Sequence, residues 1–488
     1  MGRDRHPDGV RVDPATSADL ETFAAASREI DRMQGPLLHR AGDQNSRLFV
    51  MAFDGTGNDM EAQPRENWTN VALLYEQARE RQRSNPSIGS GYVAGPGTQD
   101  GAVAALVDGI RGHTFESRVE QGYAQFIDQA AIWLERNPGA DISVAVAGFS
   151  RGAEQAAAFT RVVHERGIQD PDGAVYERNA DGIITGVTYT RPPQVAPGEV
   201  RQAALSLDPV GTGTPMDHDR RLAPSVMGGL QISALHEQRD QFRSTEAIEP
   251  GMSADRRFLQ VWVAGAHSNI GGSYAANGLS DRSFNLGVDY LNSLSDAPLF
   301  AKRAESLDAA LHVIHRSHEH QIVYTQRGYR DGVRDVVERL APDAACRPEP
   351  RACFEREPID SRLAADTTFR DVQTTPNPQA LHLAPESADP RPFWKRSESA
   401  PAPSAPRTAV DDLFDRLSIG AATREPAAMR EASRNYVETD GGQQWLQAGR
   451  DQNAAQAAER AAELARQAEA QRAPPVEAAE VSAPVMRR

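Results

Sequence analysis

Short, nearly continuous apolar segments alternate with stretches of helical spacing in the first part of the chain. An apolar run bounded by turn residues is typical of a strand buried on both faces, whereas apolar residues three and four positions apart indicate an amphipathic helix. The strand pattern is found in residues 47–54, 142–147, 203–207 and 258–264. Helical spacing is found in residues 17–33, 67–83 and 153–163, and in two stretches that end near residue 137. This alternation predicts an α/β fold with a mostly parallel central sheet flanked by helices.

The rest of the chain predicts additions to this sheet. Helical spacing continues from Asp281 to near Leu340, which predicts helical C-terminal additions. A stretch rich in Pro, Ala and Ser is typical of a linker, and the Ala-, Glu-, Gln- and Arg-rich residues after it favour a solvated helix or disorder. The expected segments are an N-terminal arm (1–46), the α/β core (47–300), an extension that caps the core or faces a membrane (301–396), the linker (397–410) and a helical or disordered tail (411–488).

Charge and composition exclude several classes of protein. The chain has 53 Lys and Arg against 68 Asp and Glu, a net charge of −15, so we expect no nucleic-acid partner. Its first residues contain no apolar core of a signal peptide, and it contains no run of about 18 apolar residues. We therefore expect neither a signal peptide nor a membrane-spanning helix.

The two cysteines leave two alternatives open. Cys346 and Cys353 either close a small disulfide loop or remain two thiols. A metal site at these cysteines would need further ligands. We expect no metal and no cofactor.

A Gly-x-Ser-x-Gly motif stands between a predicted strand and a predicted helix. It reads Gly148-Phe149-Ser150-Arg151-Gly152. The pentapeptide alone is a weak signal, but in this context it is typical of a turn that exposes a nucleophilic serine, with Gly148 and Gly152 making room for close backbone packing. Because the N-terminus of the following helix suits an oxyanion, we expect the Arg151 N–H to be one oxyanion donor.

A serine nucleophile needs a base, and the base needs a carboxylate that holds its tautomer. His267 follows the predicted strand 258–264 and precedes a Gly-rich loop, so we expect it to be the base; the alternative is an ordinary loop histidine. Asp208 follows the strand 203–207 and is the expected acid, although aspartate is also common at turn starts. Asp240 is the substitute acid. The resulting order of Ser, Asp and His is the one expected for an α/β-hydrolase.

The turn Phe53-Asp54-Gly55-Thr56-Gly57-Asn58 follows the first predicted strand. We expect the N–H of Gly55 or Thr56 to be the second oxyanion donor, with Asp54 bracing the turn. An aspartyl nucleophile of the Asp-x-Asp-Gly-Thr kind would need a carboxylate where Ala52 stands. A purely structural turn is the remaining alternative.

With these motifs, the chain resembles the α/β-hydrolase domain called domain of unknown function 2235, found in phospholipase effectors of bacterial type VI secretion. The resemblance rests on blocks that occur in the family's order between about residues 47 and 295. The blocks are residues 53–58, 92–98, 148–153, 207–211 and 261–274. The family's pattern implies that Ser150 is the nucleophile and that Asp208 and His267 complete the triad. One departure is Pro209, which stands where the family usually has threonine and removes a backbone donor.

The resemblance implies a serine esterase or phospholipase that releases fatty acid from glycerophospholipids at a membrane surface, as a secreted antibacterial toxin. It also implies synthesis in the bacterial cytoplasm, and delivery without a signal peptide to the periplasm or membrane of a target cell. The implied partners are a cognate immunity protein and a component of the secretion apparatus. Two other functions fit the residues: a non-enzymatic binding module on a hydrolase scaffold, and a triad hydrolase that acts on a small ester, peptide or amide.

Overall fold

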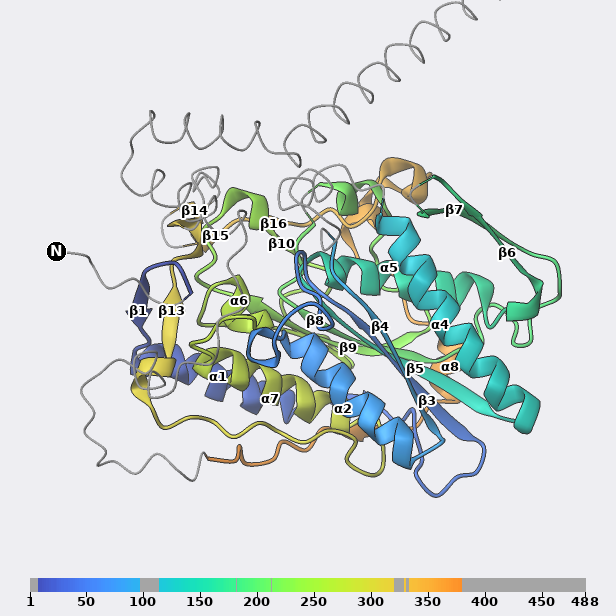
Figure 1. The fold of residues 1–488 in the computed structure, drawn as a ribbon, viewed down its shortest axis with the longest axis horizontal. Helices are drawn as coiled ribbons and strands as arrows, with labels where there is room; N and C mark the ends of the chain where they lie inside the picture. Colours follow the sequence, from blue (N-terminus) through green and yellow to red (C-terminus); the bar gives the residue numbers. More distant parts are fainter. Residues whose placement is uncertain are drawn as a thin grey trace, which may run out of the picture. The chain divides into compact units, whose positions relative to one another are not determined.

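A seven-stranded sheet lies at the centre of the described part of the chain (Figure 1). The computed structural model describes residues 8–96, 114–180, 182–211, 213–319, 329–330 and 333–379. From one edge to the other, the strands are β11 (Gly251–Met252), β12 (Phe258–Val263), β9 (Val226–Ala234), β8 (Gln202–Leu207), β5 (Asp141–Phe149), β3 (Ser46–Phe53) and β4 (Ile88–Val93). Neighbouring strands are parallel except β11 and β12. The prediction of a mostly parallel sheet is confirmed.

Both faces of the sheet are buried in apolar cores. Along β3, Leu48 and Val50 pack into one core, while Phe49 and Met51 pack into the other. Strands covered on both faces need apolar side chains at every position, because alternate residues point to opposite faces. For this reason the apolar runs in the sequence correctly predicted the positions of β3, β5, β8 and β12.

Helices cover the two faces (Figure 1). The core on one face includes α1 (Ser17–Ile30), α2 (Asn70–Ser84) and α7 (Gly278–Asn292), and the core on the other includes α4 (Phe115–Arg136) and α5 (Arg151–Arg166). These helices confirm the predictions for residues 17–33, 67–83 and 153–163, and α4 confirms the second of the two stretches that end near residue 137. The first of those stretches lies largely outside the described residues. The described chain also has two short helices, α6 (His267–Gly271) and α8 (Ser361–Ala365).

The order of the strands brings the predicted site residues to one edge of the sheet. From β3 the chain crosses to β4 on one side, and it later returns to β5 on the other side of β3. In open parallel sheets, ligands bind beyond the carboxyl ends of the strands at such a change of direction. The turn after β3 and the serine turn after β5 flank this point.

Two strands of the sheet, β4 and β9, have no clear strand pattern in the sequence. Glycines and polar residues interrupt both: β9 contains Gly228-Gly229 and the polar Gln231. The structure satisfies this buried side chain, because Gln231 Nε2 donates to the carbonyl of Thr245 at 2.8 Å. A polar residue whose partner comes from another segment cannot be recognised as a strand residue from local sequence.

The helical pattern predicted from Asp281 to Leu340 is correct only as far as Asn292, where α7 ends. The described residues after it form turns, short helices and short strands, of which the strands are β13 (Val313–His315), β14 (Tyr329–Arg330), β15 (Val333–Arg334), β16 (Val336–Val337) and β17 (Phe369–Asp371). β13 pairs with β1 (Val12–Pro14) of the N-terminal arm. Pairing with a distant segment overrides local helical spacing. The prediction of helical additions is therefore wrong for most of the described part of the extension, whose helices are the five-residue α8 and four short 3-10 helices.

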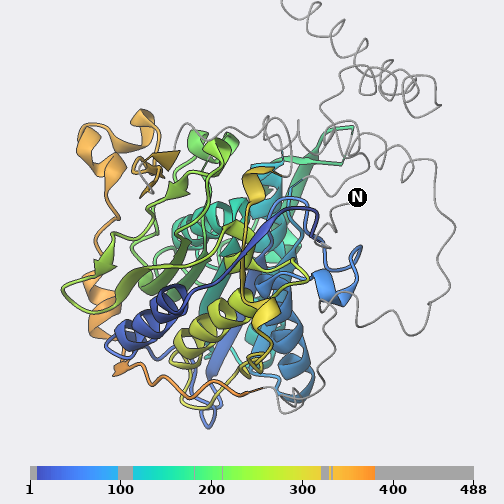
Figure 2. The same ribbon diagram turned by 90° about the vertical axis from the view of Figure 1, so that its left-hand side faces the viewer.

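The extension packs along the N-terminal arm and the sheet. β17 pairs with β2 (Gln34–Pro36), and β16 pairs with β10 (Ser244–Thr245). In the view turned by 90°, the orange segment of the extension lies beside the dark-blue helix α1 (Figure 2). The proposed boundaries at residues 46 and 300 therefore separate segments that are in close contact.

The remaining segments lie outside the central sheet. Cys346 and Cys353 form a disulfide bond. The segment between α5 and β8 contains an antiparallel hairpin of β6 (Ala174–Arg178) and β7 (Ile184–Tyr189). The linker 397–410 and the tail 411–488 lie outside the described residues. Within the described part of the chain, none of the helices has the length and apolarity needed to cross a membrane.

Candidate active site

Ser150 lies on the turn between β5 and α5, with a backbone φ of 59°. A positive φ is strained for a residue with a side chain and is typical of a nucleophile turn between strand and helix. A Cβ on Gly148 would lie 2.5 Å from the carbonyl oxygen of Gly152, and a Cβ on Gly152 would lie 2.3 Å from that of Asp54. Both positions flanking Ser150 therefore require glycine.

Asp208 and His267 form a hydrogen-bonded pair beyond the ends of β8 and β12. Nδ1 of His267 lies 2.5 Å from Oδ2 of Asp208, and both residues are buried. An ionised carboxylate only accepts hydrogen bonds, so the hydrogen belongs to Nδ1 and the lone pair to Nε2. In this tautomer the imidazole is able to accept a proton from a nucleophile.

The His267 ring lies beside the serine turn. Its centroid is 4.6 Å from that of Phe149, the residue before Ser150. Phe242 packs edge-on against the same imidazole, with centroids 4.9 Å apart. A Cβ on Gly271, at the end of α6, would lie 2.0 Å from the Phe149 ring, so glycine lets α6 approach the serine turn. The structure thus brings His267 and Asp208 together and sets the imidazole against the segment that carries Ser150.

Burial and charge set the protonation of the pair. Burial lowers the pKa of His267 below its ordinary 6.5, although the hydrogen bond and charge of Asp208 act in the opposite direction. Burial acts to raise the pKa of Asp208, but the charge of Arg334 and the hydrogen bond from His267 outweigh it and hold the pKa below 3.8. At neutral pH the imidazole is therefore neutral and the carboxylate ionised.

Sequence reasoning missed two buried ion pairs at this site. Arg334 donates to both carboxylate oxygens of Asp208. Glu237 accepts the backbone N–H of His267 at 3.2 Å and pairs with Arg239 at 2.8 Å. Burial acts to raise the pKa of Glu237, but Arg239 outweighs it and lowers the pKa to about 2. The one available signal for Arg334 was Asp331-Gly332, a dipeptide that favours a hairpin, although it does not reveal what the hairpin contacts.

The turn after β3 is braced by the buried carboxylate of Asp54. It accepts hydrogen bonds from the Gly55 N–H at 2.7 Å, the Thr69 hydroxyl at 2.8 Å and the Tyr92 hydroxyl at 2.6 Å. Burial raises its pKa to about 6 despite these bonds. The bond to Asp54 occupies the Gly55 N–H, whereas the Thr56 N–H has no acceptor among the described residues. Of the two predicted donors in this turn, Thr56 is therefore the one that remains available.

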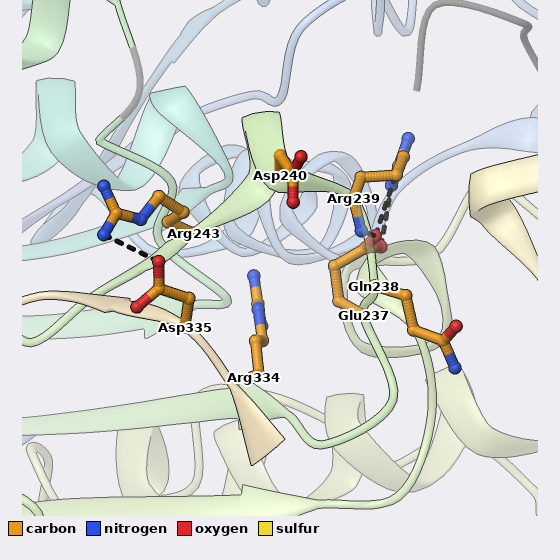
Figure 3. Close-up of a pocket in the computed structure, with 7 residues that line it drawn as sticks. All are labelled: Glu237, Gln238, Arg239, Asp240, Arg243, Arg334 and Asp335. Atoms are coloured by element: carbon orange, nitrogen blue, oxygen red, sulfur yellow. Dashed lines mark hydrogen bonds and ion pairs between the residues drawn. The ribbon is translucent and has the colours of Figure 1, made fainter. Parts of the chain in front are cut away.

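Arg151 and Asp240 occupy different places relative to this pair. Arg151 is the first residue of α5, and its Nη1 lies 3.3 Å from the Thr56 hydroxyl, which links the serine turn to the turn after β3. Asp240 lines a small polar pocket together with Glu237, Gln238, Arg239, Arg243, Arg334 and Asp335 (Figure 3). Nδ1 of His267 contacts Asp208, the predicted acid.

Comparison with known proteins relates part of the chain to one family. Residues 47–181 and 199–300 match the family described as the catalytic domain of Tle1-like phospholipase effectors of type VI secretion. The match includes the turn after β3, the serine turn, Asp208 and His267. No match was found among curated proteins.

Several solved structures are similar to this chain at low identity. An uncharacterized protein from Pseudomonas aeruginosa is 17% identical with a TM-score of 0.34, covering 61% of this chain and 51% of that one. The Tle1 effector bound to the VgrG spike is 17% identical with a TM-score of 0.30, covering 49% and 52%. A hydrolase of the α/β superfamily from Xanthomonas campestris is 14% identical with a TM-score of 0.25, covering 49% and 97%. The chain thus spans about half the length of the first two proteins.

The family match agrees with the resemblance seen in the sequence motifs. It covers the central sheet from Arg47 onward, and its break between residues 181 and 199 contains β7, which belongs to the separate β6–β7 hairpin. The fold observed for this region, a mostly parallel sheet between helices with a serine turn after a central strand, is that of an α/β-hydrolase. Residues 47–181 and 199–300 thus have an α/β-hydrolase fold and match the catalytic domain of Tle1-like phospholipase effectors of type VI secretion.

Proposed function

We propose that this protein is a serine esterase that hydrolyses acyl esters of glycerophospholipids with Ser150 as nucleophile, His267 as base and Asp208 as acid. The observation that carries the proposal is the buried Asp208–His267 pair, whose imidazole packs against the residue before Ser150. The left-handed backbone of Ser150 supports the same assignment. A carboxylate, an imidazole and a serine that follow three strands of one parallel sheet are the parts that acyl transfer requires.

In the proposed reaction, Nε2 of His267 takes the proton of the Ser150 hydroxyl as its oxygen attacks the ester carbonyl. The backbone N–H groups of Arg151 and Thr56 stabilise the oxyanion, and the positive end of the α5 dipole adds to this. His267 then gives its proton to the leaving alcohol, which leaves an acyl group on Ser150. A water molecule deprotonated by His267 then attacks the acyl group, and His267 returns the proton to the Ser150 oxygen as the fatty acid leaves. The residues of this chain supply each proton transfer.

Phospholipid is the proposed substrate because the matched catalytic domains belong to phospholipase effectors. For the same reason we propose that the protein is delivered by a type VI secretion apparatus to the periplasm or membrane of a target bacterium. A component of that apparatus and a cognate immunity protein are the proposed partners. The first of these partners has a counterpart in the Tle1 effector, which was solved bound to the VgrG spike.

Release of fatty acid from phospholipid vesicles tests this function. The full chain is incubated with vesicles of phosphatidylethanolamine and phosphatidylglycerol, and free fatty acid is measured with and without a serine-directed fluorophosphonate. We expect release by the untreated protein, covalent labelling at Ser150 and loss of release after labelling. Labelling without release from vesicles, together with cleavage of a soluble ester, would instead favour a small-molecule hydrolase. A folded protein with neither labelling nor hydrolysis would be a binding module.

The acid limb of the pH profile is expected to lie below pH 6.5. Only neutral His267 is able to accept the serine proton, and its pKa is lowered from 6.5 by burial. Activity therefore persists as the pH falls to 6.5 and is lost only below that value. The measurement is kcat/KM for a soluble ester between about pH 4.5 and 8.5, a range of about two units on either side of the ordinary histidine pKa.

Asp54 is the control for this profile, because its carboxyl has a pKa of about 6 and titrates nearby. If His267 sets the limb, the limb keeps its position in Asp54→Asn even if the overall rate falls. A limb that disappears in Asp54→Asn would assign it to the turn after β3. A limb above pH 6.5 in both proteins would contradict the assignment to His267.

A further inference from the structure

We infer that Arg334 is the positioning residue of this site, which fixes the Asp208 carboxylate so that one oxygen faces His267. The inference rests on the proposed function, since it concerns the same triad. Arg334 ends β15, in the extension that follows the residues matched by the effector family. A residue from outside the matched region would therefore complete the geometry of the acid.

Every N–H group of the Arg334 guanidinium has an acceptor. Nη1 donates to Oδ1 of Asp208 at 2.5 Å and to the carbonyl of Ala234 at 3.0 Å. Nη2 donates to Oδ2 of Asp208 at 3.1 Å and to the carbonyl of Phe242 at 2.5 Å, and Nε donates to the same carbonyl at 3.1 Å. A guanidinium has five N–H groups, so its orientation is fully determined. Three residues therefore hold Arg334 in place: Asp208, Ala234 at the end of β9, and Phe242, which packs on His267.

The carboxylate of Asp208 is saturated in the same way. Oδ1 accepts from the Ala234 N–H at 2.8 Å and from Arg334, and Oδ2 accepts from His267 and from Arg334. A carboxylate has about four lone-pair sites. Three of them are taken by groups that do not react, and the fourth faces Nδ1 of His267. The carboxylate is therefore unable to rotate away from the imidazole without breaking bonds to Arg334.

The backbone around Asp208 explains why a side-chain donor is needed. Asp208 has a φ of 43°, a strained value for a residue with a side chain. The next residue, Pro209, has no N–H that could hold the carboxylate. Arg334 supplies two donors from another segment. Its planar fork matches a carboxylate, which the single ammonium group of lysine does not.

Arg334 is the positively charged side chain that contacts the carboxylate of Asp208. The side chains of Arg334 and Asp208 are 4% and 0% exposed. His267 is also influenced by the buried pair of Glu237 and Arg239. In Figure 3, Arg334 lies between this pair and the Arg243–Asp335 pair. An unpaired carboxylate buried at this depth would be costly, so Arg334 keeps Asp208 ionised next to His267.

The segment that carries Arg334 is anchored to the core. β16, which begins two residues after Arg334, pairs with β10 in register Ser244 to Val336 and Thr245 to Val337. Further along, the carbonyl of Leu340 accepts from the backbone N–H of Arg220 at 2.9 Å. These bonds hold the extension against the loops that follow β8 and β9.

The test replaces Arg334 with glutamine and with lysine in the full chain. In Arg334→Gln we expect kcat to fall about 100-fold, because the Asp208 carboxylate loses its orientation. KM should change little, because the residues that bind the substrate are not altered. The acid limb of the pH profile is expected to rise by about one pH unit, since loss of a nearby positive charge favours the imidazolium. In Arg334→Lys the charge is kept and the fork is lost, so kcat falls about tenfold while the limb stays near its wild-type position.

Asp335→Asn is the matched control in the same segment. Its ion pair with Arg243 is partly exposed, at 40% and 44%, and does not touch Asp208. We expect activity within about twofold of wild type, because exposed pairs contribute little. Folding of each variant is checked by circular dichroism and thermal unfolding. If Arg334→Gln does not fold, Arg334→Lys decides, and a folded lysine variant with wild-type kcat would overturn the inference. A folded glutamine variant whose activity falls equally at all pH values would also overturn it, because that is the result of a purely structural role.

A measurement that needs no substrate separates this inference from the proposed function. The pKa of His267 is followed by NMR in histidine-labelled wild type and in Arg334→Gln. A rise of about one unit in the variant supports the role of Arg334 even if vesicle hydrolysis fails. An unchanged His267 pKa in an active enzyme would overturn the role of Arg334 and leave the esterase assignment intact.

Discussion

Alanine in place of Ser150 is expected to abolish the release of fatty acid from phospholipid vesicles. Removal of the nucleophile of a serine hydrolase typically lowers kcat by about 10⁶, because the acyl-enzyme cannot form and the base has no proton to take. The stability of the fold should change by less than about 1 kcal/mol, since the substitution removes one hydroxyl from a turn whose hydrogen bonds are made by its backbone. The measurements are fatty-acid release and thermal unfolding of both proteins.

Ser143 provides a matched control for this experiment. It lies on β5, the same strand that leads to Ser150, and is fully buried. Its hydroxyl has no hydrogen-bond partner among the described residues. Ser143→Ala should therefore keep full activity. Full hydrolysis by folded Ser150→Ala would rule out Ser150 as the nucleophile, and loss of activity in both variants would indicate a general effect of altering β5.

The second large effect is expected for Asp208→Asn, with kcat lowered by about 10⁴. An amide can donate a hydrogen bond where the carboxylate only accepts, so it favours the tautomer of His267 that carries its hydrogen on Nε2. In that tautomer the imidazole cannot take the serine proton. The substitution also leaves the buried charge of Arg334 unpaired, which should cost about 3–5 kcal/mol of stability. Activity and urea unfolding are therefore measured together.

Asp289→Asn controls for the loss of a buried ion pair. Asp289 lies on α7 and pairs with Lys302 at 2.6 Å, with side chains 2% and 7% exposed. This variant should lose stability but keep kcat at temperatures where it remains folded. If Asp208→Asn and Asp289→Asn lower kcat to the same extent, the effect of Asp208 would be one of stability, and the acid would have to be sought elsewhere.

The sequence predicted the sheet well because its strands are buried on both faces. β3, β5, β8 and β12 are apolar at nearly every position, and each ends in the turn or loop that carries a proposed site residue. Ser150, Asp208 and His267 could be proposed because the acid, the base and the nucleophile each follow such a strand. Their roles stay predictions until the variants above are measured.

Local pattern could not predict contacts between distant segments. β9 needs a partner for Gln231, and β13 forms only because the N-terminal arm lies beside it. Arg334 is the clearest case: 126 positions separate it from Asp208, and nothing in the sequence around it indicates a buried carboxylate partner. Local sequence likewise could not indicate that the Gly55 N–H donates to the side chain of Asp54.

The contact of the extension with Asp208 has a consequence for synthesis of the protein on the ribosome. All strands of the central sheet are complete by Val263, and His267 follows at once, so the sheet and the triad have been translated before Arg334 is added. The acid gains its guanidinium partner only when the extension has emerged and paired with the loops after β8 and β9. A nascent chain would thus hold a complete sheet before Asp208 gains its guanidinium partner, so under the proposed function full hydrolytic activity would require the extension as well as the sheet.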